Sequence, residues 1–425
     1  MNIELHLLQS FPTSNLNRDD IGQPKSVTFG GVVRGRVSSQ CLKRSARTLF
    51  PRYGLDQSEL GERTKRLLPI TARLLDGVSD ADVPSDEARG IVQQALAWMG
   101  FAIAEKDLTQ YLFFLGPEAA EELAVYCREH WDDLADQGDK RRKLMSDLEK
   151  ARERHQLAEG NEDKRKARTG VTSVETKIKK LDEVPAAKKK EARKAAGRVL
   201  SAGRSVDIAL FGRMIANNKD FNVDAASQVA HAISTHAVST EFDFFTAVDD
   251  LKANEADQDA GADMIGVVDF NAACYYRYAN VDLDQLRRNL VSGSGATADD
   301  GEINELMDRA LGAWIRAFVN ATPSGKQNSM AAHTRPDTLM MVAREHGSWN
   351  LANAFLKPVE GTAIMEDSTE RLFAHFSKLR GFYGDDEITK VAASSLSGEV
   401  SGLEEGEIVS SLDALVQSAV TASHG

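Results

Sequence analysis

The chain is poor in cysteine and has no long apolar run. Its 425 residues include only three cysteines, Cys41, Cys127 and Cys274. Cysteines so far apart in the sequence supply neither a disulfide framework nor a paired zinc-binding motif. No stretch approaches the roughly 20 consecutive apolar residues that a membrane helix needs, and the N-terminus lacks the basic and then apolar order of a secretory signal. We therefore expect a cytoplasmic protein with no membrane contact.

Motifs typical of catalytic and nucleotide-binding sites are also missing. Gly30 and Gly35 have the spacing of a P-loop, but the residues that follow are not the Lys and Ser or Thr that the motif needs. His231 and His236 are five residues apart, which places them on different faces of a helix. No zinc-ligand spacing or nucleophile elbow occurs. The sequence therefore predicts a protein that is not an enzyme and that carries no cofactor or resident metal.

The charge of the chain is unevenly distributed. Hydrophobic residues make up 42% of the chain and charged residues 27%, as in a soluble globular protein. The formal net charge of -12 argues, as an average, against binding to nucleic acid. Residues 1–53, however, hold eight basic and three acidic residues, and residues 139–198 hold 20 basic and 11 acidic residues. Two basic segments on an acidic body favour a nucleic-acid partner.

The N-terminal pattern predicts two strands and a capped helix. In Asn2–Leu8 apolar residues alternate with polar ones, as in a strand with one buried face. Val32–Val37 follows a Gly-Gly pair and predicts a second strand. Ser38 then suits the N-cap of a helix. The buried face of that helix would hold Leu42, Ala46 and Leu49.

A long helical region follows. Residues 55–204 read as helical. Within this region, apolar residues recur at helical spacing in several runs, the last of which ends at Leu115. From Asp139 to Arg198 aromatic residues are absent and Lys, Arg, Glu and Ala dominate, which indicates solvated helices or a mobile arm.

Strand-like sequence returns at Val206–Leu210 and at Ile265–Tyr278, and helices are expected from Leu283 and over Ile303–Phe318. The acidic tail, residues 385–425, has room for one short amphipathic helix. The whole pattern predicts an α+β fold in which a sheet domain is interrupted by a helical insertion.

The strongest candidate site lies around the second strand and the helix after it. Arg34 and Arg36 are two apart on a strand and so project from one face. The helix start at Ser38 and Gln40 offers backbone N–H groups to an anion. Further basic residues surround this point and favour a nucleic-acid backbone site, with a solvated basic helix as the alternative. They are Arg18, Lys25, Lys43, Arg44 and Arg47.

Three apolar residues and one lysine are secondary candidates. Phe244 and Phe245 lie in a segment bounded by turn-forming residues, where an exposed ring can stack on or wedge between bases. Met214 is a second candidate wedge. Core packing is the alternative for all three. Lys326 lies on a glycine-containing loop that suits either a phosphate contact or a plain surface turn.

Two acidic pairs support a competing function. Asp19-Asp20 and Asp249-Asp250 have the chemistry to hold magnesium for phosphodiester hydrolysis. Carboxylates in such pairs more often cap turns or balance neighbouring arginines. A metal-dependent RNA endonuclease that uses Asp19, Asp20 or Asp249 therefore stays open as an alternative.

Several ordered motifs together resemble the CasC family, the backbone subunit of the type I-E CRISPR Cascade complex. They span residues 1 to about 357. The matching runs are Leu16–Asp20, Gly30–Gln40, Leu42–Arg44, Val206–Leu210, Gly212–Met214, His231–His236, Phe245–Asp250, Tyr276–Asn280 and Ala352–Phe355.

This resemblance implies the shape of a right hand. An RRM-like (ferredoxin-like) palm would carry an inserted helical fingers domain and a β-hairpin thumb. The palm would comprise residues 1–54, 205–235 and 269–384. The fingers would comprise residues 55–204, with a Lys-rich arm at 139–198, and the thumb residues 236–268. The tail, residues 385–425, matches nothing in the family.

The resemblance also implies roles and partners. Copies of the chain would line up along a CRISPR RNA, with Arg18, Lys25, Ser38, Gln40, Lys43 and Arg44 on its backbone. Met214 and Phe245 would wedge where a guide base is turned out. Further partners would be the target DNA strand paired to the guide and the large, small, guide-processing and 5′-capping Cascade subunits. Contact with phosphates alone suits a protein that accepts any guide.

Two other functions make different predictions. A nuclease, as in related subunits of type III complexes, predicts metal-dependent RNA cleavage that is lost on replacing the aspartates. A transcription regulator predicts a dimer that binds one DNA sequence and carries no RNA.

Overall fold

The computed structural model describes residues 1–104, 107–201, 205–215, 221–247, 264–294 and 299–424. The chain divides into two compact units. The first, here called the sheet unit, comprises Met1–Asp56, Ala225–Asn289 and Ala298–Gly425. The second, the helical unit, comprises Gln57–Asp224 and Leu290–Thr297. Residues 205–224, which the family resemblance would include in the palm, belong to the helical unit.

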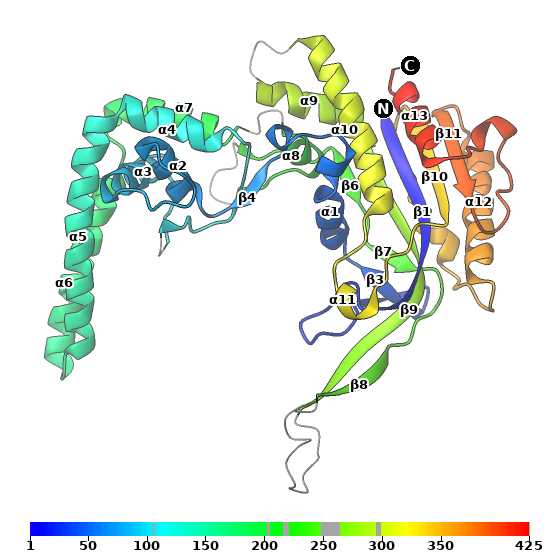
Figure 1. Ribbon diagram of the computed structural model, residues 1–425, viewed down its shortest axis with the longest axis horizontal. Helices are drawn as coiled ribbons and strands as arrows, with labels where there is room; N and C mark the ends of the chain where they lie inside the picture. Colours follow the sequence, from blue (N-terminus) through cyan, green and yellow to red (C-terminus); the bar gives the residue numbers. More distant parts are fainter. Residues whose placement is uncertain (105–106, 202–204, 216–220, 248–263, 295–298, 425) are drawn as a thin grey trace, which may run out of the picture. The chain divides into compact units, whose positions relative to one another are not determined.

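The sheet unit is built on an antiparallel sheet (Figure 1). Its main path runs β11-β10-β1-β9-β7-β3-β2, and β6 and β8 also pair with β9. The strands are β1 (Asn2–Ser14), β2 (Ser26–Phe29), β3 (Val32–Val37), β6 (Ser227–Val229), β7 (Ala232–Ser234), β8 (Glu241–Ala247), β9 (Met264–Asp282), β10 (Thr338–Arg344) and β11 (Ile388–Ser395).

The central strand β1 is buried on both faces, not on one as its alternation predicts. Ile3 and His6 both have 0% exposure. The polar face tolerates burial because its groups are paired: the Glu4 carboxylate accepts a hydrogen bond from the Trp349 N–H at 3.1 Å. His6 and Arg344 lie 3.3 and 3.6 Å from the same carboxylate. Alternation alone cannot reveal this compensation, because the partners are distant in sequence.

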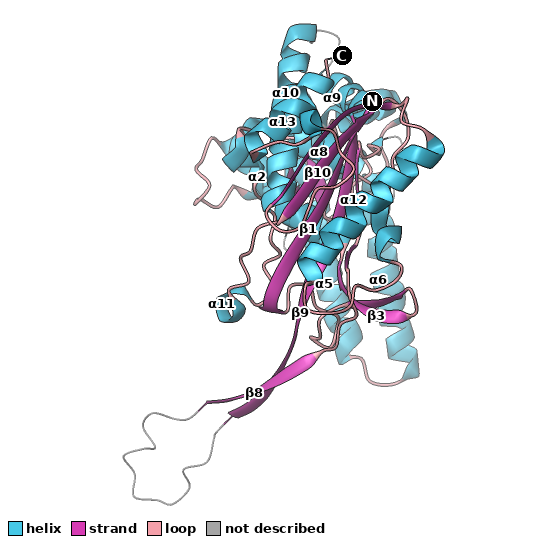
Figure 2. Cartoon of the chain, turned by 90° about the vertical axis from the view of Figure 1, so that its right-hand side faces the viewer, coloured by secondary structure: helices cyan, strands magenta, loops and turns pink. Residues whose placement is uncertain are grey.

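Helices cover the sheet. Helix α12 lies along the face of β1 and β10 (Figure 2), where Phe373 and Phe376 join Met340 in a buried cluster. On α10, Trp314 and Phe318 are buried and stack. The helices of this unit are α1 (Ser39–Arg47), α10 (Asp300–Asn320), α11 (Gln327–Met330), α12 (Ile364–Tyr383) and α13 (Leu412–Ala422), with α9 (Leu283–Ser294) continuing into the helical unit.

Two local predictions of the sequence are confirmed here. The Ser38 hydroxyl caps α1 by accepting from the Cys41 N–H at 3.4 Å, and Leu42 and Ala46 face the core. The acidic tail forms the predicted amphipathic helix, α13, which buries Leu415 and Val416. The same tail also supplies β11, an edge strand that its polar sequence did not predict.

The helical unit has its own core, formed by α2, α3, α4 and α7 with the start of α5. Its elements are β4 (Glu62–Thr64), α2 (Leu67–Asp76), α3 (Asp86–Trp98), β5 (Phe113–Leu115), α4 (Ala119–Glu129), α5 (Trp131–Leu157), α6 (Asn161–Asp182), α7 (Lys189–Val199) and α8 (Val206–Phe211). None of the helices among the described residues is long and apolar enough to cross a membrane.

Two predictions within this unit are wrong. Val206–Leu210 lies in helix α8 and not in a strand. All of its side chains are buried, including the charged Asp207, so the pattern of burial gives no period that separates a helix from a strand. The run that ends at Leu115 forms strand β5, paired with β4, and not a helix. Its apolar residues do not share one buried face, because Leu112 is 60% exposed.

Most of the Lys-rich segment forms two long helices, α5 and α6, which lie side by side (Figure 1). Its last part forms α7, whose apolar side chains join the core of the helical unit. No residue of α6 is buried, as expected for solvated helices. Near the root of the pair, the buried Arg141 donates to the Gln94 side chain at 3.1 Å and forms an ion pair with Asp182. This residue therefore joins both arm helices to α3.

Candidate nucleic-acid interface

A loop and a helix start hold the predicted basic residues together on the sheet unit. The Asn17 carbonyl accepts from the Lys25 N–H at 2.9 Å, and its side-chain oxygen accepts from the Ser38 N–H at 2.9 Å. The Arg36 N–H donates to the Lys25 carbonyl at 2.9 Å. Asn17 thus fixes loop 15–25 against the N-terminus of α1. We call the resulting surface the basic cradle: Arg18, Lys25, Arg36, Gln40, Lys43, Arg44 and Arg47.

His231 completes the cradle, although sequence reasoning considered it only as a metal ligand. Its Nδ1 accepts from the Ser39 N–H at 3.2 Å and lies 3.4 Å from an Arg36 nitrogen. Burial, and then the charges of Arg36 and Lys25, lower the pKa of His231. The imidazole therefore stays neutral at neutral pH and can act as the acceptor that these contacts require.

Four basic side chains of the cradle have no acidic partner in the part of the chain that the structure describes. Among the described residues, no carboxylate forms an ion pair with Arg18, Lys25, Arg36 or Arg44. The neighbouring Asp19 carboxylate instead accepts from the backbone N–H groups of Ile21 and Gln23, at 3.1 and 2.8 Å. It caps the loop, as acidic residues in turns commonly do.

Two expectations about this site are wrong. Arg34 is not on the surface: it has 0% exposure, and its guanidinium donates to the carbonyls of Ser234 and Phe355 at 3.1 and 2.9 Å. The helix start is also largely closed to an anion. The N–H groups of Ser38, Ser39 and Cys41 already donate to protein acceptors. Charged side chains, more than backbone N–H groups, are what this surface offers to an anion.

The loop of Lys326 lies against the loop of Arg18. A Cβ atom on Gly325 would stand 2.5 and 2.4 Å from the carbonyl oxygens of Asn15 and Leu16, so only glycine permits this approach. Lys326 itself has a positive φ of 50°. Such a conformation is uncommon for a residue with a side chain and is held by its surroundings.

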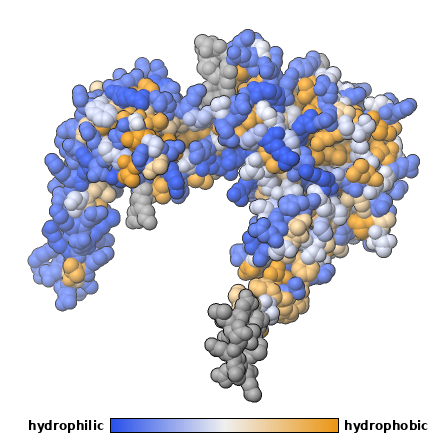
Figure 3. Space-filling view, in the orientation of Figure 1, coloured by the Kyte–Doolittle hydropathy of each residue, from blue (hydrophilic) through white to orange (hydrophobic). Residues whose placement is uncertain are grey.

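The predicted wedge aromatics lie on the hairpin formed by β8 and the start of β9. Phe244 is 63% exposed and Phe245 44% exposed, so neither is a core residue. They are consecutive residues of β8, so their side chains point to opposite faces of the hairpin. Phe244 pairs with Val267 and Phe245 with Gly266. The Phe245 ring covers Gly266, where a Cβ atom would lie 2.2 Å from it. Apolar side chains are evident over this hairpin in Figure 3.

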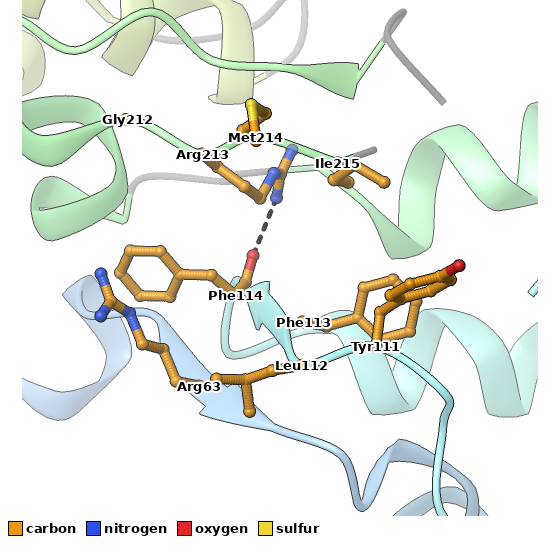
Figure 4. A pocket seen from close by; sticks show the side chains of 9 residues that line it. All are labelled: Arg63, Tyr111, Leu112, Phe113, Phe114, Gly212, Arg213, Met214 and Ile215. Carbon is orange, nitrogen blue, oxygen red and sulfur yellow. Dashed lines mark hydrogen bonds between the residues drawn. The ribbon is translucent and has the colours of Figure 1, made fainter. Parts of the chain in front are cut away.

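Met214 belongs to the helical unit, at the rim of a cavity of about 340 Å³ (Figure 4). It is 83% exposed, which excludes a core role. Residues that line the cavity also contact one another. Arg213 donates to the Phe114 carbonyl at 3.1 Å, and the Arg63 guanidinium lies 4.6 Å from the centre of the Phe114 ring. An exposed apolar side chain beside a guanidinium and aromatic rings is a surface suited to a planar base.

The residues of the nuclease alternative show no metal site where they are described. Among those parts of the chain, no group of three or more His, Cys, Asp or Glu side chains is placed to hold a metal ion. Asp249 and Asp250 lie outside the described residues.

Comparison with known proteins places the chain in a family. A family model described as CT1975-like protein matches residues 3–418. The chain belongs to the CT1975-like protein family. No curated protein matches it.

Two solved structures resemble it over their full length. One, titled as a CRISPR RNA-guided surveillance complex, pre-nicking, has a TM-score of 0.73 and 29% identity, with 100% of both chains covered. The other, titled as a CRISPR RNA-guided surveillance complex, has a TM-score of 0.65 and 25% identity, covering 99% of this chain and 100% of that one.

Proposed function

We propose that this CT1975-like chain is a non-catalytic subunit of a Cascade-type CRISPR surveillance complex and that its basic cradle holds the guide RNA by its backbone. Similarity over the full length of chains from two such complexes supports the assignment. The observation that carries the mechanism is the cradle itself, a cluster of basic side chains in which Arg18, Lys25, Arg36 and Arg44 have no carboxylate partner among the described residues.

The cradle has the chemistry to bind phosphate without reading sequence. Flexible lysine and arginine side chains attract phosphodiesters through charge, and each phosphate neutralised releases counterions. No array of fixed donors and acceptors that would read base edges is needed for this mode of binding. Binding of this kind accepts any guide, and pairing of the guide with its target then supplies specificity.

The exposed apolar residues have a separate role in this proposal. Phe245 on the hairpin, or Phe244 on its opposite face, would wedge at a turned-out guide base, and Met214 would do so from the helical unit. Stacking of this kind contributes on the order of 1–3 kcal/mol per base and tolerates any sequence. Because the phosphate contacts of the cradle would supply most of the binding free energy, loss of one wedge would alter the shape of the bound RNA more than its affinity.

The finer assignment is to the type I-E backbone subunit. Copies of the chain would oligomerise along one RNA, together with the large, small, guide-processing and 5′-capping subunits, and the guide would expose its bases to a target DNA strand. The resemblance of the motifs from Leu16 to Phe355 supports this assignment.

Charge reversal in the cradle tests the proposal. We expect the double variant Lys43→Glu/Arg44→Glu, expressed with a CRISPR array, to purify without RNA, because repulsion replaces attraction at two adjacent positions. The matched control is Lys378→Glu/Lys390→Glu, which makes the same change in charge at two exposed lysines of the sheet unit. Absorbance at two wavelengths and sizing of the extracted RNA give the readout.

Equal amounts of RNA with both double variants would refute the cradle assignment. Magnesium-dependent RNA cleavage that disappears in Asp19→Ala or Asp249→Ala would refute the non-catalytic role and favour the nuclease.

A further inference from the structure

A second polar pocket lies on the sheet unit, where α1 runs into the short 3-10 helix η1 (Phe50–Tyr53). Its volume is about 330 Å³. The walls come from α1 and η1, from the end of α10, and from the segment before β10. The lining residues that matter here are Ser45, Thr48, Arg52, Asn320, His333 and Arg335.

The pocket is basic. Arg52, Arg335 and His333 line it, and no carboxylate is among its lining residues. Arg335 donates to the side-chain oxygen of Asn320, a neutral partner that leaves the positive charge uncompensated. Within the described parts of the chain, the Arg52 guanidinium has no hydrogen-bond or ion-pair partner. Two guanidinium groups around hydroxyl and amide groups form a typical receptor for an oxyanion.

The wall that carries His333 and Arg335 is fixed from the core. Arg277, with 1% exposure, donates to the side-chain oxygen of Gln9. The Gln9 amide nitrogen in turn donates to the Thr334 carbonyl at 3.0 Å. This chain of hydrogen bonds holds the segment without using the charged groups of the pocket. The pocket is therefore preorganised, which lowers the cost of ordering its side chains around a ligand.

The pocket continues the surface of the basic cradle. Arg44 of the cradle lies on α1, and Thr48 of the pocket, four residues later, is the C-cap of that helix, so the two are neighbours on its surface. Four residues advance a helix by about 6 Å. A strand held at Arg44 therefore reaches the pocket with little further extension.

We propose that this pocket binds a second phosphate group of the same RNA strand, beyond the phosphates held at the cradle. The inference rests on the proposed function, because proximity to the cradle is what favours a nucleic-acid phosphate over a carboxylate from a protein. Arg52 and Arg335 supply the charge, and the Ser45 hydroxyl supplies a neutral donor, whereas the Thr48 hydroxyl already donates to the Ser45 carbonyl at 2.9 Å.

The test is the salt dependence of RNA affinity for the full chain. The probe is a labelled, unstructured RNA of guide length. Each phosphate contact in a single strand contributes about 0.7 to the slope of log affinity against log salt. We expect Arg52→Gln/Arg335→Gln to reduce the magnitude of the slope by about 0.7 or more. Lys378→Gln/Lys390→Gln, which removes the same charge elsewhere on the sheet unit, should leave it unchanged.

A charge-conserving variant distinguishes the loss of a phosphate contact from the loss of the fold. Arg52→Lys/Arg335→Lys keeps both charges and should retain most of the wild-type slope. A thermal melt of each variant shows whether the fold survives.

The outcomes separate the two proposals. If Lys43→Glu/Arg44→Glu abolishes binding while Arg52→Gln/Arg335→Gln leaves the slope unchanged, the pocket inference is wrong and the proposed function stands. If neither double variant alters binding, the proposed function itself fails. A loss of self-association without any change in slope would identify a carboxylate of a second copy as the occupant and overturn the inference. A lower melting temperature with an unchanged slope would show that the arginines only support the ends of α1 and α10, and would also overturn it.

Discussion

The cradle and the arm are both basic, but they use their charges in different ways. On the arm, many charges are paired within it: Lys140 lies 2.5 Å from Asp136, Lys166 lies 2.9 Å from Glu162, and Arg152 pairs with Glu175 on the facing helix at 3.3 Å. On the cradle, Asp19, which follows Arg18 in the sequence, is instead engaged with backbone N–H groups.

The comparison shows that net charge alone does not locate a binding surface. Residues 139–198 have the larger excess of basic residues, nine against five for residues 1–53. Exposed ion pairs on a helix are weak, but they offset the field that an anion would otherwise feel. Helices α5 and α6 of the arm are therefore a solvated pair (blue in Figure 3). On the cradle, Arg18, Lys25, Arg36 and Arg44 have no carboxylate partner among the described residues.

The largest expected difference between the two regions is in RNA affinity. Lys43→Glu/Arg44→Glu should weaken binding of a guide-length RNA by about 100-fold or more at physiological salt. Lys177→Glu/Lys180→Glu makes the same change on α6 of the arm and should weaken binding by less than about 3-fold. Fluorescence anisotropy titrations measure both. Equal losses in the two variants would mean that the arm binds RNA as strongly as the cradle, and the comparison would fail.

A second prediction compares Arg34 and Arg36, two arginines of strand β3, in their effects on stability and on RNA binding. Arg34→Gln should reduce the free energy of unfolding by about 3 kcal/mol, because it removes a buried charge from fixed carbonyl partners and leaves those carbonyls unsatisfied. Arg36→Gln should change stability by less than about 1 kcal/mol but should reduce the salt dependence of RNA binding. Urea denaturation and salt titration of both variants give the two readouts. If the Arg34→Gln protein were as stable as the wild type but bound RNA more weakly, Arg34 would be an RNA-binding residue and not a structural one.

A third prediction compares two ion pairs of the arm. Arg141 is buried at the root, whereas Arg152 is exposed. Arg141→Ala should lower the free energy of unfolding by about 2 kcal/mol, because Asp182 and Gln94 lose their partner. Arg152→Ala should lower it by less than about 0.5 kcal/mol. Denaturation followed by the tryptophan fluorescence of the helical unit measures both, and equal effects would contradict the assigned difference in burial.

The smallest predicted effect concerns pH. Because the pKa of His231 is lowered from 6.5 by burial and by Arg36 and Lys25, the unfolded chain takes up a proton at this position before the folded chain does. The stability that neutral His231 contributes is therefore complete above pH 6.5 and is lost as pH falls through the lower, folded-state pKa. His231→Gln should reduce the loss of melting temperature on acidification. An unchanged pH profile would contradict this role.

The sequence predicted best those features that depend on neighbouring residues. Strand Val32–Val37 and the cap at Ser38 occur as predicted, because alternation and capping act over a few residues. The burial of Arg34 could not be predicted in this way, since its partners Ser234 and Phe355 are brought to it only by the folded sheet. The position of His231 beside Arg36 likewise depends on the pairing of β3 with β7.

The errors in secondary structure have the same origin. Val206–Phe211 contains Val, Ile and Phe, which favour strands, yet it forms a helix in which the side chains from Val206 to Leu210 are buried. Strand β11 lies in a polar tail and becomes ordered only by pairing with β10. Intrinsic propensity is a weak guide where contacts distant in sequence decide the outcome.

The central claim is that the cradle binds an RNA backbone through charge and without regard to sequence. Its most direct test is equilibrium binding of the purified chain to two guide-length RNAs of unrelated sequence, between about 50 and 200 mM salt. The account predicts the same affinity and the same steep salt dependence for both RNAs, and loss of both in Lys43→Glu/Arg44→Glu. Preference for one sequence, or affinity that does not change with salt, would contradict it.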